Sequence, residues 1–160
     1  MEYICSLVIV EDIEKARKFY EEILEQKVSV DYGENITFEG GFSLHQKEHF
    51  KELIDHKPII RKTNNFELYF EHDAIEAFVE KLKANNIELV HELKKQPWQQ
   101  RVIRFYDHDH NMIEVGESMT YVAYRLFKEG YIIKKISEIT YMPEDVIEKA
   151  VEKYSSASSE

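Results

Sequence analysis

The chain has 160 residues and a formal net charge of -10, with 43% hydrophobic and 32% charged residues. This composition is typical of a globular protein with one domain or two small modules. Because no stretch approaches the roughly 18–20 apolar residues that a membrane span needs, we expect no contact with a membrane. The acidity argues against a nucleic-acid partner, since binding there depends on neutralising phosphates with Lys and Arg.

The beginning of the chain and its cysteine content indicate a cellular compartment. The first residues lack the basic flank and the long apolar region of a signal peptide. Cys5 is the only cysteine, so no intrachain disulfide can form. Both features predict a cytoplasmic protein.

The first half of the chain predicts one strand, one helix and three further strands. Residues 3–10 are mostly apolar and rich in β-branched side chains, which predicts a buried strand. Asp12 is a suitable N-cap for a helix whose apolar face consists of Ile13, Ala16, Phe19, Tyr20, Ile23 and Leu24. Short β-rich pieces follow at 27–32, 35–38 and 42–46, with glycines in the turns. A polar connection over 49–63 includes one short helix near residues 48–54.

The second half repeats this order. A strand is predicted at 66–70, then a helix capped by Asp73 with Glu76 completing a capping-box-like pair, then strands at 87–93, 101–106 and 112–116. We therefore predict an α+β fold in which residues 1–117 form two βαβββ modules, with a curved mixed sheet and a central cavity. One α+β sandwich without true repetition is the alternative.

Residues 118–154 predict a helical extension. Ser118 can cap a first helix, Ile133, Ile136 and Ile139 indicate a second, and a third begins at Pro143. The last two resemble a helix-turn-helix, but the third helix is mainly acidic, whereas a helix that faces phosphates should be basic. We therefore predict that the helices pack against the modules or a partner subunit, and that the tail 155–160 is disordered.

Two stretches carry a resemblance to a known superfamily. Val10-Glu11-Asp12, followed by Ala16 and Phe19-Tyr20, resembles the opening of modules in glyoxalase, bleomycin-resistance and dioxygenase proteins, the vicinal oxygen chelate superfamily. Residues 96–115, QPWQQRVIRFYDHDHNMIEV, resemble the closing stretch of these proteins. The likeness covers residues 3–117 and implies a small-molecule ligand and a homodimer.

The resemblance also implies a metal centre, to which this chain contributes an incomplete set of ligands. Superfamily members commonly hold a divalent metal such as Zn, Ni, Fe or Mn with His or Glu from the first and last strands of each module, and the metal binds substrate oxygens. The matched positions here are Cys5, His45 or a neighbour, Phe66 and Glu114. By resemblance, Glu114, His45 and Cys5 are candidate metal ligands, and Glu114 is also the candidate catalytic base.

Each of these candidates has a simpler interpretation. Glu114 could form an ion pair with Arg101 or Arg104, Cys5 could be a small buried hydrophobic residue, and His45 could face solvent. The run Asp-His-Asp-His at 107–110 could attract a metal, although adjacent turn residues point apart, which favours a surface turn.

Four residues are candidates for binding an organic ligand: Glu67, Tyr69, Trp98 and Arg101. Glu67 and Tyr69 line the cavity only if the phase of their strand turns them inward, and the opposite phase is equally consistent with the pattern. Trp98, the only tryptophan, could stack on a flat or cationic ligand or pack as a loop aromatic.

These features predict a glyoxalase/bleomycin-resistance-like protein that binds a small organic molecule in the cavity between its modules, without a complete glyoxalase metal centre. One alternative is a metal-dependent lyase or dioxygenase with Glu114 as a ligand. A second is a ligand-responsive regulator that acts through the C-terminal helices.

Overall fold

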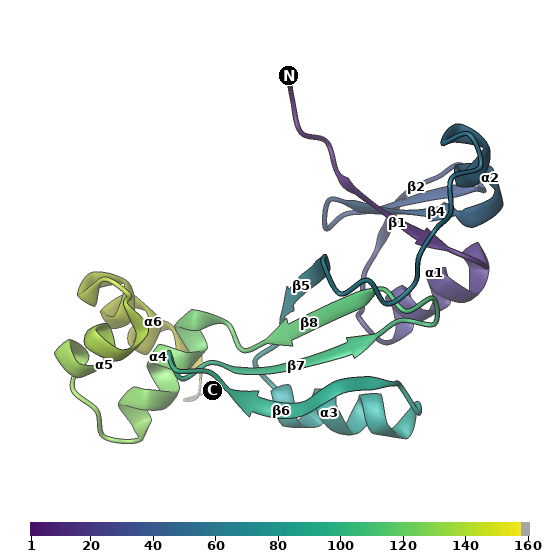
Figure 1. Ribbon diagram of the computed structural model, residues 1–160. Helices are drawn as coiled ribbons and strands as arrows, with labels where there is room; N and C mark the ends of the chain where they lie inside the picture. Colours follow the sequence, from purple (N-terminus) through teal and green to yellow (C-terminus); the bar gives the residue numbers. More distant parts are fainter. Residues whose placement is uncertain (158–160) are drawn as a thin grey trace. The chain divides into compact units, whose positions relative to one another are not determined.

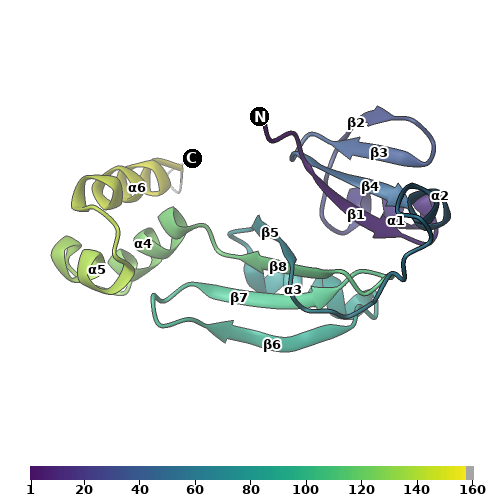
Figure 2. The same cartoon turned by 45° about the horizontal axis from the view of Figure 1, so that its top comes forward.

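The computed structural model describes residues 1–157 and divides into two compact units (Figures 1 and 2). The first unit comprises Met1–Glu67, Asn85–Glu88 and Tyr106–Met112. The second comprises Leu68–Ala84, Leu89–Phe105 and the described residues from Ile113 onward. None of the helices in residues 1–157 combines the length and apolar character that crossing a bilayer requires.

The predicted α+β class and the repeated βαβββ order are confirmed. The first sheet has the strand order β1-β4-β3-β2 and the second the order β5-β8-β7-β6, so corresponding strands occupy corresponding places. In the first sheet β1 runs parallel to β4, and the other neighbours are antiparallel. The first sheet and its helices are β1 (Ser6–Val10), α1 (Ile13–Glu22), β2 (Val28–Asp31), β3 (Asn35–Phe38), β4 (Phe42–Gln46) and α2 (Lys47–Leu53). The second sheet and its helix are β5 (Glu67–Glu71), α3 (Ile75–Ala84), β6 (Leu89–Lys95), β7 (Arg101–Tyr106) and β8 (Met112–Gly116).

Helix α1 covers one face of the first sheet because alternate strand residues are apolar. The rings of Phe38 and Phe42 stack with their centroids 4.8 Å apart, and the Tyr20 ring of α1 packs on both. Tyr20 is fully buried, and its hydroxyl donates a hydrogen bond to Asp107 Oδ2 at 3.0 Å. Each large apolar side chain buried in this way contributes about 1.5–3 kcal/mol.

Helix α3 covers the second sheet in the same manner. The Phe78 ring of α3 lies 5.9 Å from the Phe105 ring of β7. Four apolar residues of the two central strands are buried: Ile103, Phe105, Ile113 and Val115. Because strand side chains alternate between faces, this packing turns the residues between them to the side away from α3.

The predicted extension forms three helices, α4 (Met119–Lys128), α5 (Ile133–Thr140) and α6 (Glu144–Ala157). Ser118 is the N-cap of α4, since its Oγ accepts a hydrogen bond from Tyr121 N at 3.1 Å. The helices share a hydrophobic core of their own, formed by Val122, Ala123, Leu126, Ile136, Ile147 and Ala150. The predicted disordered tail is wrong for residues 155–157, which continue α6. The other tail residues, 158–160, lie outside the described residues.

Asp73 joins the extension to the second sheet. Its Oδ1 accepts a hydrogen bond from Ser118 N at 3.0 Å, and its Oδ2 accepts one from the Tyr154 hydroxyl at 2.6 Å. Helix α3 begins two residues later, at Ile75. The residue predicted as a helix cap therefore serves a tertiary contact within the second unit.

Candidate functional site

The first sheet carries a row of polar side chains on the face away from α1. Because Phe42 and Leu44 belong to the core against α1, Ser43 and His45 point to the other side of β4. The facing residues of β3 in the sheet register are Thr37 and Asn35. Ser43 and His45 are 1% and 7% exposed, so both polar side chains are buried.

Cys5 and His45 lie on this face but have separate neighbours. Ser43 Oγ lies 2.8 Å from Thr37 Oγ1 and 3.5 Å from Cys5 Sγ. His45 is the second residue after Ser43 on the same strand, which places it about 7 Å farther along. The two candidate metal ligands in this unit therefore share a face without sharing a neighbour.

Both ring nitrogens of His45 have partners. Nδ1 lies 3.4 Å from Asn35 Nδ2, and Nε2 lies 3.0 Å from His49 Nδ1. Burial lowers the pKa of His45, the neighbouring His49 lowers it further, and Glu34 opposes them in part. The lowered pKa favours the neutral imidazole of His45 within this histidine pair.

On the second sheet Glu114 forms an ion pair with Arg104, on the face away from α3. The pair joins Arg104 Nη2 of β7 to Glu114 Oε2 of β8. Arg104 Nη1 also lies 3.5 Å from His91 Nε2 on β6. Glu114 is only 7% exposed. Of the two arginines that the sequence offered as its partner, the fold uses Arg104.

Gln100 brings two of the predicted ligand-binding residues together. Its Nε2 donates hydrogen bonds to the Tyr69 hydroxyl and to Glu117 O, both at 2.8 Å, and its Oε1 accepts one from Trp98 Nε1 at 2.9 Å. The hydrogen bond from Gln100 shows that the Tyr69 side chain points to the side of β5 on which Gln100 lies. Because side chains alternate along a strand, Glu67 points to the same side. Burial raises the pKa of Tyr69 to about 12. Gln100 itself was missed, because a glutamine in a loop gives no chemical signal.

Arg101 does not pair with Glu114 but forms ion pairs that connect parts of the second unit. Its guanidinium pairs with Glu117 and with Glu76 of α3. The hydrogen bond to Glu117 is the main reason why the pKa of Arg101 is raised. The residue proposed for ligand binding thus connects β7 to α3 and to the segment before α4.

The predicted metal ligands do not fit a metal ion as they stand. Among residues 1–157 no group of three or more His, Cys, Asp or Glu side chains is arranged to hold one. His45 has both nitrogens occupied by Asn35 and His49, and Glu114 is neutralised by Arg104.

The Asp-His-Asp-His turn has a structural role. Asp107 accepts hydrogen bonds from the backbone N–H groups of Asp109 and Asn111 at 2.9 and 2.8 Å. The His108 ring packs against Phe19, with centroids 5.3 Å apart. Burial raises the pKa of Asp107, although the hydrogen bonds oppose this effect. These contacts agree with the surface turn that the sequence favoured.

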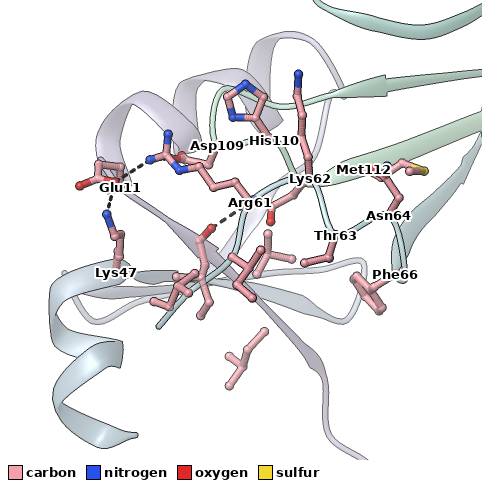
Figure 3. Close-up of a pocket in the computed structure, with 16 residues that line it drawn as sticks. Glu11, Lys47, Arg61, Lys62, Thr63, Asn64, Phe66, Asp109, His110 and Met112 are labelled. Carbon is pink, nitrogen blue, oxygen red and sulfur yellow. Dashed lines mark hydrogen bonds and ion pairs between the residues drawn. The ribbon is translucent and has the colours of Figure 1, made fainter. Parts of the chain in front are cut away.

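A pocket of about 180 Å³ within the first unit was not predicted (Figure 3). Three segments line it: residues 7–9 of β1, the connecting segment 59–66 and the turn 109–112. Glu11 and Lys47 complete the lining. The charged residues of this set were overlooked because their charges come together only when the connecting segment lies beside β1.

The comparisons with known proteins agree with these features. A family model described as a glyoxalase-like domain matches residues 3–120. A protein of unknown function from Agrobacterium tumefaciens is 38% identical, with a TM-score of 0.66, covering 74% of this chain and 94% of its own.

Two more distant structures show the same fold. A lactoylglutathione lyase from Agrobacterium tumefaciens is 16% identical, with a TM-score of 0.53, covering 73% of this chain and 93% of its own. The fosfomycin resistance protein FosX from Listeria monocytogenes is 18% identical, with a TM-score of 0.55, covering 74% of this chain and 93% of its own. No curated protein matches the chain.

Proposed function

Because the chain belongs to the glyoxalase-like family of the vicinal oxygen chelate superfamily, we propose that it binds a small organic molecule on the polar faces of its sheets, without a complete glyoxalase metal centre. The observation that carries this proposal is the burial of polar side chains on the sheet faces that point away from α1 and α3. The buried residues of this kind are Ser43, His45, Gln100 and Glu114.

Burial of polar groups on such faces favours a binding function over a purely structural one. A buried polar group costs free energy unless it has hydrogen-bond partners, and an apolar residue would pack at lower cost. Here His45 forms a hydrogen bond with the His49 side chain, whereas Glu114 is held by its ion pair with Arg104. Such a network holds donors and acceptors in fixed positions, which a binding site needs.

The second sheet indicates the chemistry of the ligand. The Glu114–Arg104 pair offers an acceptor and a donor of opposite charge, so it suits a polar group that carries both. Trp98 is 39% exposed and Tyr69 is 47% exposed, and Gln100 holds both. A ligand with a polar end and a flat or apolar part would use both features.

The test is a binding measurement that uses the fluorescence of Trp98, the only tryptophan. Bleomycin, fosfomycin, S-lactoylglutathione and a library of small aromatic fragments serve as probes. We expect at least one probe to change the emission of the wild-type protein and to bind at least tenfold more weakly to Glu114→Gln, because a charged hydrogen bond is worth about 1.5–3 kcal/mol. Glu80→Gln, an exposed carboxylate on α3, is the matched control.

Two results would overturn the proposal. Either no probe binds, or a probe binds Glu114→Gln as tightly as wild type. Elemental analysis of both proteins accompanies the titration. Stoichiometric metal that is lost in Glu114→Gln would instead support the metal-dependent lyase or dioxygenase alternative.

A further inference from the structure

The pocket in the first unit has a charged end and an apolar end (Figure 3). Glu11, Lys47 and Arg61 lie together at one side, and Phe66 and Met112 lie at the other. Its volume of about 180 Å³ is below the roughly 300–1,000 Å³ of pockets for drug-sized ligands. The pocket therefore suits a small metabolite with one charged group and a short apolar part.

At the charged end, Glu11 already occupies a binding position for a carboxylate. Its Oε2 accepts hydrogen bonds from Lys47 Nζ at 2.7 Å and from Arg61 Nη2 at 2.6 Å. The hydrogen bond from Lys47 is the main reason why the pKa of Glu11 is lowered. Two cations from separate segments thus converge on one carboxylate, which is the arrangement that recognises a carboxylate ligand.

The carboxylate of Glu11 can be displaced at low cost. Its side chain is 49% exposed, and exposed ion pairs contribute little to stability because water screens both charges. Glu11 would return to solvent when a ligand takes its place. A ligand carboxylate would gain the same two cations and, in addition, the apolar contacts of its own tail.

The lining of the pocket includes large apolar side chains that are exposed to solvent. Leu7, Ile60 and Phe66 line the pocket and are 49%, 72% and 54% exposed. A ligand tail that covers them would remove apolar surface from water, which is favourable in proportion to the area buried.

The pocket lining also includes His110, one of whose ring nitrogens forms no hydrogen bond within residues 1–157. His110 Nδ1 is buried and has no hydrogen-bond partner among the described residues. Because this nitrogen is shielded from solvent, a ligand in the open pocket does not reach it, and the contacts proposed below do not include it.

We propose that this pocket binds a small monocarboxylate with an apolar tail, and that Glu11 occupies the carboxylate position until the ligand arrives. Lys47 and Arg61 bind the carboxylate, and Leu7, Ile60 and Phe66 contact the tail. The site uses none of the residues tested by the Trp98 titration, so either proposal can fail without the other.

The experiment measures binding of hexanoate to the full chain by NMR titration, with acetate and hexanol as companion probes. Hexanoate should bind more tightly than acetate, by up to about fourfold for each methylene that enters the pocket. Hexanol, which lacks the charge, should bind at least tenfold more weakly than hexanoate. Shifted resonances should include Leu7 and Ile60.

The decisive variant is Glu11→Gln, because damage to the fold would not raise affinity. Without the competing carboxylate, hexanoate should bind about fivefold more tightly, because Lys47 and Arg61 would no longer be paired with Glu11 before the ligand arrives. Lys47→Gln should weaken binding at least threefold. Glu22→Gln, an exposed carboxylate on α1 outside this pocket, should bind as wild type does. Equal affinity of wild type and Glu11→Gln, or of hexanoate and acetate, would overturn the proposal.

Discussion

Replacement of Glu117 by Gln should destabilise the second unit more than any exposed charge substitution. The Glu117 side chain is fully buried. Its oxygens accept hydrogen bonds from Arg101 N at 3.0 Å, from Arg101 Nη2 at 2.6 Å, and from Arg125 Nε and Nη2, both at 3.1 Å. Burial tends to raise the pKa of Glu117, but these bonds outweigh it and the pKa is lowered.

The magnitude follows from the burial of the two arginines. Removing one partner of a buried ion pair costs about 3–5 kcal/mol because it leaves an uncompensated charge. Arg101 and Arg125 remain 22% and 17% exposed, and Arg125 also donates to Gln99 O. Since water and this carbonyl reduce the loss, we expect about 3 kcal/mol for Glu117→Gln. For a chain of this length that corresponds to a fall in Tm of about 6–12 °C.

Urea unfolding followed by Trp98 fluorescence is the suitable assay. Trp98 Nε1 donates to Gln100 Oε1, and Gln100 Nε2 donates to Glu117 O, so the probe belongs to the same network. Glu129→Gln is the matched control, since Glu129 also pairs with Arg125 but is 48% exposed and should cost at most about 0.5 kcal/mol. If Glu117→Gln lies within 1 kcal/mol of Glu129→Gln, the inference from burial is wrong.

Three further predictions concern single contacts. Gly116→Ala would place a Cβ 2.7 Å from Gln100 Nε2, so we expect a loss of about 1–3 kcal/mol in urea unfolding, and an unchanged midpoint would contradict this. Tyr20→Phe removes the hydrogen bond to Asp107 and should cost about 1 kcal/mol by the same measurement, whereas a gain in stability would refute it. Because the pKa of His45 is lowered in the fold, the unfolded chain binds more protons below its ordinary pKa of about 6.5. Wild type should therefore lose stability from pH 7 to pH 5, and His45→Gln should lose less; equal slopes would refute the reasoning.

The predicted strand bounds agree with the structure where the sequence marks both ends of a strand, and they disagree where the end depends on the neighbouring strand. The predicted bounds 101–106 and 112–116 coincide with β7 and β8, because a turn of polar residues separates two short runs rich in apolar residues. The first strand was predicted from residue 3 but begins at Ser6, opposite Phe42 of β4. Tyr3 and Ile4 continue the apolar pattern and are 76% and 74% exposed. A strand extends only as far as the neighbouring strand that pairs with it. The pattern of apolar residues in the sequence does not show where that neighbouring strand ends.

The predicted site residues show a similar division. Trp98 and Tyr69 were chosen for their chemistry, and the hydrogen bonds of Gln100 hold both. The sequence left open whether Arg101 or Arg104 pairs with Glu114, because both arginines lie on one strand that is close to Glu114 in the sequence. Their separation by three residues places them on opposite faces, and only Arg104 shares the face of Glu114.

By itself, the sequence determined the repeated element order, the helix-facing apolar residues, the cap at Ser118 and the family. These depend on short-range spacing and on side-chain chemistry, which the chain carries directly. The tertiary structure decided the partners of the charged residues: Arg104 for Glu114, Arg101 and Arg125 for Glu117, and Lys47 with Arg61 for Glu11. Ion pairs and pockets require segments distant in the chain to meet, and in an acidic chain each cation has many possible partners. The physical reason for this division is that the spacing of apolar residues indicates on which face of a helix or strand a side chain lies. Only the folded chain determines which other side chains lie opposite that face.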